Sequence, residues 1–304
     1  MRLYVIGTEG QVARALREAA TQDSEITFGC AGSTAVDIRN PKLIEQALTE
    51  FSPDIVINPA AYTAVDRAES EPDLAFAVNR DGAFNVATAA ARRSIPIVHL
   101  STDYVFDGKK PDRYVETDHV SPTGVYGRSK LEGEYAVASA NKRHLILRTS
   151  WVYAPFGSNF LRTILRLADE RDKLSVVNDQ IGCPTYAPDI ASAIIRIAKR
   201  IEAQGWDEAC AGVTHLAGPD EISWYDFAQK ILCRNEKIAA RSVTVNAISS
   251  ADYPTPVQRP ANSRLCCDRL EAIFNVRLPL LESSLDDCMR RLLETRTTPT
   301  GARN

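Results

Sequence analysis

The chain has 304 residues, of which 44% are hydrophobic and 25% are charged, and its formal net charge is −3. This composition is typical of a globular protein with one large domain or two domains that share a core. The small negative charge gives no electrostatic reason to expect a nucleic acid or an anionic membrane as a partner. No apolar run approaches the roughly 20 residues of a membrane span, and we expect a cytoplasmic protein.

The first half of the chain alternates apolar strands with helices. The pattern predicts strands at about residues 3–6, 26–28, 53–58, 95–100 and 145–152, and helices at about 11–21, 41–51 and 72–92. Such alternation favours a parallel sheet covered by helices on both faces. We therefore predict an α/β fold in which residues 1–153 form a doubly wound, Rossmann-like dinucleotide-binding domain.

The second half is less regular. It predicts helices at about 160–172, 189–203 and 224–233, and strands at about 174–178 and 213–217. We expect residues 154–304 to form mainly a smaller α/β substrate-binding lobe, from which the chain returns to the first domain at about 188–217. The polar tail from Thr295 to Asn304 is expected to be disordered.

A glycine turn, Gly7-Thr8-Glu9-Gly10-Gln11-Val12-Ala13, follows the first strand and opens the first helix. In this context a glycine pattern predicts a dinucleotide site, because Gly10 lets backbone N–H groups approach a pyrophosphate at the helix N-terminus. Ala13 replaces the usual third glycine and is still small. Glu9 is unfavourable beside a diphosphate unless it points to solvent. A strand-to-helix turn without a ligand is the alternative interpretation.

The choice between NAD and NADP is usually made about 20 residues further on, where an acidic residue bonds the ribose hydroxyls of NAD. The matching segment here, Gly29-Cys30-Ala31-Gly32-Ser33, has neither an acid nor a base. Arg39 lies close enough in sequence to attract a 2′-phosphate if its loop folds back. We therefore expect NADPH as the cofactor, with NADH tolerated.

Three residues form a candidate catalytic set for hydride transfer to a ketone. Tyr126 and Lys130 lie four residues apart and share one face of a predicted helix. A nearby ammonium favours the phenolate and lowers the pKa of a tyrosine, which helps the phenol to act as an acid near neutral pH. The hydroxyl of Thr102, at the end of an earlier strand, would bond the same substrate oxygen. The alternative is an ordinary exposed helix pair.

Other polar and aromatic residues near these motifs have simpler explanations. We interpret Asp103, Asp107, Glu116 and Asp118 as turn-forming acids of a loop, rather than as an acid–base pair or a metal site. Trp151, Tyr153 and Phe156 are either core residues or, because of their place at a strand end, contacts for a sugar or a base.

With these motifs the chain resembles the extended short-chain dehydrogenase/reductase superfamily and, more narrowly, the dTDP-4-dehydrorhamnose reductase family. The resemblance extends over nearly the whole chain. Its blocks are Gly7-x-x-Gly10-Gln11-Val12, Ala60 to Glu69, Ser101 to Gly108, Tyr126 to Lys130, Arg148 to Tyr153, Asn178 to Thr185, and Arg259 to Leu265.

The resemblance implies NAD(P)H-dependent reduction of the 4-keto group of dTDP-6-deoxy-L-lyxo-4-hexulose to dTDP-L-rhamnose. It implies that Thr102, Tyr126 and Lys130 are catalytic. The cofactor residues that it implies are Gly7, Gly10, Gln11, Val12, Asp37, Ile38, Ala60, Ala61, Tyr62, Tyr126 and Lys130. The implied substrate contacts are Thr102, Tyr104, Tyr126, Trp151 and Asn262.

The chain departs from the family pattern at three points. Some members bind Mg²⁺ through glutamates at a dimer interface, but Ala15 stands at one such position and no glutamate lies near Pro188. We therefore expect no bound metal, no obligatory protein partner, and a monomer or a weak homodimer. Pro59 replaces a small residue in the turn after Asn58, which leaves the backbone path there open.

Two other functions remain possible from the sequence. A non-catalytic, dinucleotide-binding regulatory subunit, like that of methionine adenosyltransferase, resembles the same family. A nucleotide-sugar epimerase would oxidise and then reduce its substrate on a retained cofactor. The complete set of Thr102, Tyr126 and Lys130 favours the reductase.

Overall fold

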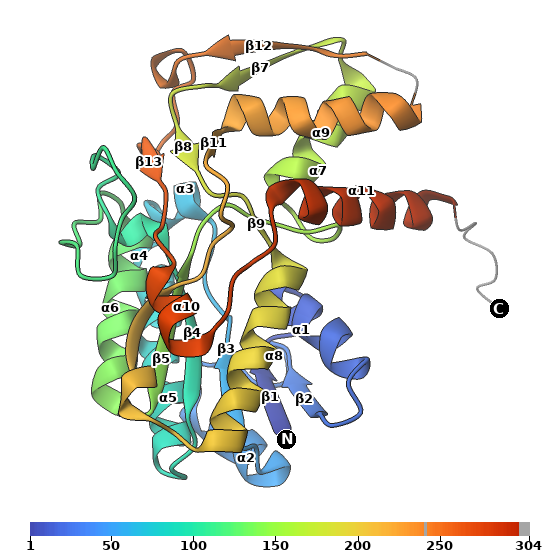
Figure 1. The fold of residues 1–304 in the computed structure, drawn as a ribbon. Helices are drawn as coiled ribbons and strands as arrows, with labels where there is room; N and C mark the ends of the chain where they lie inside the picture. Colours follow the sequence, from blue (N-terminus) through green and yellow to red (C-terminus); the bar gives the residue numbers. More distant parts are fainter. Residues whose placement is uncertain (240–241, 298–304) are drawn as a thin grey trace.

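A computed structural model of the chain describes residues 1–239 and 242–297. A six-stranded parallel sheet forms the larger lobe, in the order β10-β5-β4-β3-β1-β2 (Figure 1). Its strands are β1 (Arg2–Ile6), β2 (Thr27–Ala31), β3 (Ile55–Asn58), β4 (Ile97–Thr102), β5 (His144–Thr149) and β10 (Gly212–His215). The predicted doubly wound α/β fold is confirmed.

Helices cover both faces of this sheet. One face carries α1 (Gln11–Thr21) and α8 (Ala187–Gln204), whose apolar side chains pack on β1, β3, β4 and β5. The opposite face carries α2 (Pro41–Phe51), α5 (Ala83–Ala91) and α6 (Val125–Ala140). Local chemistry fixes their ends: Pro41 occupies the first position of α2, and the Asn40 side chain accepts a bond from the Lys42 N–H at 3.1 Å.

The helix expected over residues 72–92 is interrupted. It consists of α4 (Pro72–Phe76), a π-helical turn η1 (Ala77–Gly82), and α5. Asn79 lies in the π turn and is buried, and its side chain bonds the backbone of Tyr62 and the hydroxyl of Ser129. Single π turns inside helices are frequent at functional sites.

The strand expected over residues 145–152 is also interrupted. β5 ends at Thr149, and the short strand β6 (Val152–Tyr153) pairs with β9 (Thr185–Tyr186) rather than continuing in the main sheet. Between them Trp151 has a φ of 48°, a conformation that bulky side chains rarely adopt. This reversal carries the chain out of the sheet toward the second lobe.

The second lobe has a core of its own, built around Tyr153, Leu161, Phe227 and Leu285. Its helices are α7 (Phe160–Glu170), α9 (Trp224–Ala239) and α11 (Leu281–Thr297), beside the parallel pair β7 (Lys173–Val177) and β12 (Thr244–Ile248). A small sheet of β8 (Ile181–Gly182), β11 (Ile222–Ser223) and β13 (Asn262–Ser263) lies toward the larger lobe.

The chain crosses between the lobes more than once. α8 and β10 lie on the larger lobe, and so does α10 (Asp268–Phe274), which packs against β10 and which the sequence pattern did not place there. The sequence pattern also did not predict α11 or β12. The tail expected to be disordered from Thr295 begins inside α11, and its remainder from residue 298 lies outside the described residues.

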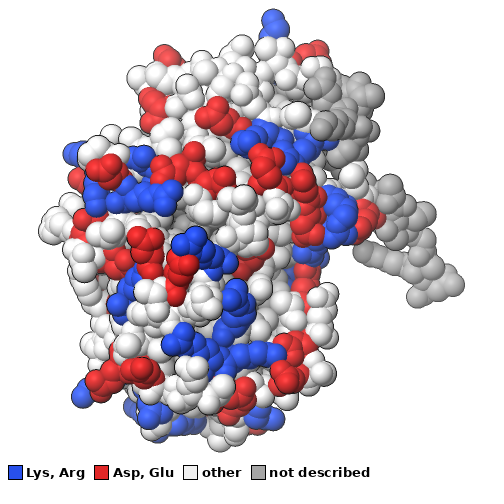
Figure 2. Space-filling model, viewed as in Figure 1, with Lys and Arg blue, Asp and Glu red and all other residues white. Residues whose placement is uncertain are grey.

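Charge is distributed evenly on the visible surface. Figure 2 shows basic and acidic side chains interspersed over this face rather than gathered in a patch of one sign. Across residues 1–239 and 242–297, the helices are all too short or too polar to cross a membrane.

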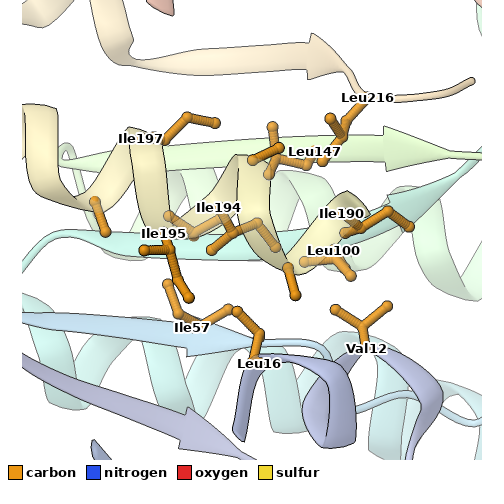
Figure 3. Packing of buried hydrophobic residues seen from close by; sticks show 14 of the residues in the cluster. Val12, Leu16, Ile57, Leu100, Leu147, Ile190, Ile194, Ile195, Ile197 and Leu216 are labelled. Carbon is orange, nitrogen blue, oxygen red and sulfur yellow. The ribbon is translucent and has the colours of Figure 1, made fainter. Parts of the chain in front are cut away.

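The packing of α8 joins the chain's second half to the sheet of the first. Ile190, Ile194 and Ile197 are fully buried against Leu100 and Leu147 (Figure 3). Complete burial of an isoleucine side chain contributes about 1.5–3 kcal/mol to folding. The helix therefore packs against one face of the strands β4 and β5.

Ile194→Ala is expected to lower the free energy of unfolding by about 2–5 kcal/mol, because it removes buried methyl groups and leaves a cavity between α8 and the sheet. Urea denaturation followed by circular dichroism measures the change. Gln204→Ala, at the exposed end of the same helix, serves as the control and should stay within about 0.5 kcal/mol of the parent. Equal effects of the two substitutions would contradict this packing role.

Candidate active site

A glycine and three polar residues gather where four parallel strands of the sheet end. Gly7 follows β1, Asn58 ends β3, Thr102 ends β4, and Ser150 follows β5. Because the strands are parallel, these positions meet at one edge of the sheet, where open α/β sheets bind their ligands. α6 brings Tyr126 to the same edge, since it packs against β4 and against the turn η2 (Asp103–Val105).

The expected catalytic residues lie together at this edge. The hydroxyl of Tyr126 is hydrogen-bonded to that of Thr102. One helical turn further on, the Nζ atom of Lys130 donates to the carbonyl oxygen of Leu100 at 2.6 Å. The side chains of Thr102 and Lys130 are almost fully buried, with 6% and 2% of their surface exposed. An exposed helix pair, the alternative interpretation of Tyr126 and Lys130, is therefore wrong.

The protonation of these groups is governed by burial. Burial raises the pKa of Tyr126 above its ordinary value, and the bond with Thr102 only partly opposes this effect. The lowering that we expected from the Lys130 ammonium is not found, since that group is directed to the Leu100 carbonyl. Burial lowers the pKa of Lys130 to about 8, although the charge of Glu134 raises it. At neutral pH the phenol is protonated and the ammonium is charged.

Asp103 belongs to this constellation and is not the plain turn-forming acid that we expected. Its Oδ1 atom lies 3.1 Å from the Thr102 hydroxyl, and the Ser263 hydroxyl bonds the same carboxyl group. Burial raises the pKa of Asp103 to about 6. A network of hydroxyl and carboxyl groups therefore extends from Tyr126 through Thr102 to Asp103 and Ser263.

A second tyrosine flanks the first. The rings of Tyr104 and Tyr126 meet edge to face with 5.4 Å between their centroids. Burial raises the pKa of Tyr104 to about 12, and the guanidinium of Arg259, which is hydrogen-bonded to it, acts in the opposite direction. Arg259 also pairs with Asp66 at 2.6 Å, which joins a loop of the second lobe to the larger lobe beside the site.

The turn after β1 fits a dinucleotide. Gly7 has a φ of +116°, which L side chains rarely adopt, and Gly10 is the N-cap of α1. A Cβ atom added at Gly10 would have no heavy atom within 4 Å, so the backbone there is open to a ligand. As a glycine, Gly10 has no side chain to cap the first N–H groups of α1, which leaves them for a phosphate. Gln11 is held in place by Asn159, whose Nδ2 atom donates to Oε1 at 2.8 Å, and Val12 is buried.

The segments after β2 and β3 provide the other expected cofactor residues. Asp37 and Arg39 form an ion pair at 2.6 Å, so the guanidinium that could attract a 2′-phosphate is bound to a neighbouring carboxylate. Ile38 is buried next to Gly82. After β3, the backbone of Ala60 bonds the Asn58 side chain at 3.2 Å, while Ala61 lies partly buried beside it. Thus Asn58 fixes the turn despite Pro59.

Two residues that the sequence analysis did not identify support this turn. Asn79 holds Tyr62 through two bonds to its backbone, of 2.8 and 3.1 Å, and also reaches Ser129 on α6. His99 is buried on β4, and its Nδ1 atom lies 3.1 Å from the side chain of Asn58. Burial and, secondarily, the charge of Lys130 hold the pKa of His99 far below its ordinary value, so the ring is neutral. A buried asparagine within an otherwise apolar helical face was the available signal for Asn79.

Trp151 is confined between the two lobes. Its indole stacks on Trp224 with 3.4 Å between centroids and an interplanar angle of 7°. A Cβ atom added at Gly182 would lie 2.3 Å from the indole Cε2 atom. The two neighbours therefore cover opposite faces of the ring, since both cannot occupy the same side.

Asn262, an expected substrate contact, has its side-chain amide hydrogen-bonded within the protein. Its Nδ2 atom donates to the carbonyl oxygens of Lys110 and Asp112, both at 2.7 Å, and its Oδ1 atom accepts two bonds from Arg264. The amide group is thus fully used, because it has two donors and two acceptor sites. Asn262 thereby fixes the loop beside the site.

A cavity of about 490 Å³ adjoins this loop. Its polar lining residues are Asp179, Gln180, Ser250, Tyr253, Thr255, Gln258 and Arg259. The cavity shares Arg259 with the neighbourhood of Tyr104, and it is large enough for part of a nucleotide. Within the described residues, His, Cys, Asp and Glu side chains form no group of three or more arranged to hold a metal ion.

Comparisons with known proteins agree with this geometry. The family described as the RmlD substrate binding domain matches residues 1–294. A dTDP-4-dehydrorhamnose reductase from Sinorhizobium fredii is 51% identical over 284 residues, which are 93% of this chain and 95% of that protein.

Two solved structures extend the similarity to three dimensions. A dTDP-4-dehydrorhamnose reductase from Clostridium acetobutylicum has a TM-score of 0.88 and 32% identity, and the match covers 96% of this chain and all of the other. A dTDP-4-dehydrorhamnose reductase from Bacillus anthracis, in complex with NADP, has a TM-score of 0.86 and 34% identity, with 95% and 99% of the two chains covered.

Gly182→Ala is expected to displace the Trp151 indole from its stack on Trp224, because the new methyl group would overlap the ring. We expect a loss of the near-ultraviolet circular dichroism signal of the stacked indoles and a destabilisation of about 1–3 kcal/mol. Trp151→Phe should lose the same signal and serves as the reference. An unchanged spectrum for Gly182→Ala would show that the ring does not lie against residue 182.

Proposed function

Because the chain belongs to the dTDP-4-dehydrorhamnose reductase family, we propose that it reduces the 4-keto group of dTDP-6-deoxy-L-lyxo-4-hexulose to dTDP-L-rhamnose. One observation in the site carries the proposal. The Tyr126 phenol is hydrogen-bonded to the Thr102 hydroxyl at a strand end, one helical turn from the buried Lys130 ammonium. The hydroxyls of Tyr126 and Thr102 therefore lie together, where the oxygen of the 4-keto group can accept a hydrogen bond from one and a proton from the other.

Each residue has a distinct task in this reaction. When bound, a reduced nicotinamide dinucleotide would supply the hydride for the C4 carbonyl. Tyr126 donates its phenolic proton to the C4 oxygen as negative charge develops there. Its raised pKa keeps that proton in place until then. Thr102 bonds the same oxygen and, held by Asp103, fixes its direction.

Lys130 is proposed to act on both the tyrosine and the cofactor. Its ammonium stabilises the phenolate that remains after proton transfer. The ammonium has three N–H donors, and the Leu100 carbonyl accepts one of them. The others are proposed to hold the ribose next to the nicotinamide. Trp151 and Tyr104 are proposed to border the sugar.

For the cofactor we propose NADPH, with NADH accepted. Support comes from the NADP complex of the Bacillus anthracis protein and from the Asp37–Arg39 pair, in which the arginine offsets the carboxylate that would repel a 2′-phosphate. We also propose that the enzyme works in the cytoplasm, that it needs no metal ion, and that it is a monomer or a weak homodimer. The metal-free part is based on Ala15, which stands where the resemblance implies a glutamate, and on the absence of a second glutamate near Pro188.

The direct test is the oxidation of NADPH or NADH, followed at the absorbance band of the reduced nicotinamide. The substrate is dTDP-4-keto-6-deoxy-glucose, with 3,5-epimerase in one arm and EDTA in another. We expect oxidation that requires the epimerase, is faster with NADPH, and survives EDTA. Loss of activity in EDTA with recovery on adding Mg²⁺ would overturn the metal-free proposal. Folded protein that oxidises neither cofactor would contradict the reductase function.

Tyr126→Phe is expected to lower kcat by a factor on the order of 10²–10⁴, because the general acid is lost, while the dissociation constant for NADPH changes little. Steady-state kinetics and nucleotide fluorescence measure the two quantities. Tyr135→Phe removes a hydroxyl from an exposed position of the same helix and should retain the parent activity. A Tyr126→Phe variant with near-parental kcat would refute the assignment of the proton donor.

A further inference from the structure

A buried carboxylate lies one helical turn beyond Lys130. Glu134 follows Lys130 by four residues and Tyr126 by eight, so the three side chains share one face of α6. Only 2% of the Glu134 side chain is exposed. Burying a charge is costly unless it is paired and hydrogen-bonded, so this carboxylate must have specific partners.

Those partners come from the two strands beneath the active-site edge. The Ser101 hydroxyl donates to the Oε1 atom of Glu134 at 2.5 Å. Arg148 donates through Nε to Oε1 at 2.8 Å and through an NH2 group to Oε2 at 2.6 Å. Ser101 on β4 and Arg148 on β5 are register partners, so their side chains leave the sheet on the same face, toward α6.

The carboxylate thereby touches the strand that holds the catalytic residues. Ser101 lies between Leu100, whose carbonyl oxygen accepts the Lys130 bond, and Thr102, which is bonded to Tyr126. Three consecutive residues of β4 are thus each joined to one of three successive turns of α6. A shift of Glu134 would move the strand end and the lysine together.

The charge of Glu134 also reaches Lys130. It raises the pKa of the lysine, against the burial that lowers this pKa to about 8. The positive charge of Arg148, the partner of Glu134, affects a different residue: it lowers the pKa of His215 on β10. Buried ion pairs contribute little net stability compared with apolar residues of similar volume, so stability alone does not account for this one.

We propose that Glu134 is a positioning residue of the reductase, whose carboxylate keeps the Lys130 ammonium charged and fixes the end of β4 that carries Thr102. The inference rests on the proposed function, because it concerns the state of Lys130 during that reaction. Other ionisable groups on elements packed against α6 are His99, Arg148, His144, Asp103, Tyr104, Arg80, Asp81, Asp73, Asp66 and Arg67.

Glu134→Gln tests the charge separately from the shape. The amide oxygen of glutamine can still accept the Ser101 bond, but the negative charge is gone. Lys130 acts while protonated, so activity is present below its pKa and is lost as the pH rises through it. Without Glu134 that pKa falls, and we expect the alkaline limb of the kcat profile to move to lower pH by roughly one unit.

Two further variants keep the test decisive. Glu134→Gln leaves Arg148 without its partner. Glu134→Gln combined with Arg148→Gln removes both buried charges and should shift the limb in the same direction but by less, because the positive charge that disfavours the ammonium is also gone. Glu132→Gln removes an exposed charge from the same helix and should leave the profile unchanged. A folded variant with lower Tm and an unshifted alkaline limb would show that Glu134 is merely structural.

Binding of NADPH alone separates this inference from the proposed function. The dissociation constant for NADPH is measured by nucleotide fluorescence between pH 6 and 10. It should rise as Lys130 loses its proton, and this rise should occur at lower pH in Glu134→Gln. Lys130→Ala should remove that pH dependence and thereby identify the group. A failure to reduce the dTDP sugar contradicts the function, whereas superimposable binding profiles of parent and Glu134→Gln contradict the role of Glu134.

Discussion

The structure depends on the docking of α6 against the end of β4. The bond from Lys130 to the Leu100 carbonyl lies in a region from which water is almost fully excluded, and the Thr102 side chain that bonds Tyr126 is buried as well. Electrostatic interactions are stronger in such a region than in water, and an unpaired charge is costly there. The lysine must therefore have a polar partner beside it. The Leu100 carbonyl is that partner, while the charge of Glu134 acts on the lysine from the next turn of the helix.

This constraint explains the roles of residues far apart in sequence. Glu134 and Arg148 bring a paired charge close to the lysine, while Asn79 ties the turn after β3 to α6 through Ser129. The second lobe approaches the same edge through Arg259, which pairs with Asp66, and through Trp224, which covers Trp151. The catalytic edge is thus held by both lobes, although its reacting groups come from the larger one.

Sequence patterns could predict the elements whose signals are local. The alternation of apolar strands and helices indicated the parallel sheet, and the Asn40-Pro41 start of α2 is set by capping chemistry within a few residues. The spacing of Tyr126 and Lys130 placed both on one helix face. The same spacing reaches Glu134, so the third member of that face was visible as a signal but was not used. α11 and β12 were missed because they are stabilised by packing in the second lobe rather than by strong local patterns.

Other properties of the site arise only from tertiary contacts. The pKa of Tyr126 was expected to fall because of the nearby lysine, but burial, which no spacing reveals, raises it. Asn262 was expected to bind substrate, yet its amide is used entirely by Lys110, Asp112 and Arg264. Trp151 has a left-handed backbone conformation, and its ring lies against Trp224 and Gly182, which are distant in sequence.

A crystal structure of the chain with NADP⁺ and dTDP-L-rhamnose would test the central claim most directly. The account predicts that the hydroxyls of Tyr126 and Thr102 both lie within hydrogen-bond distance of the O4 atom of the sugar. It also predicts that Lys130 turns toward the nicotinamide ribose while Glu134 keeps its bonds to Ser101 and Arg148. An O4 atom remote from Tyr126, or a Lys130 that bonds only the Leu100 carbonyl in the complex, would contradict it.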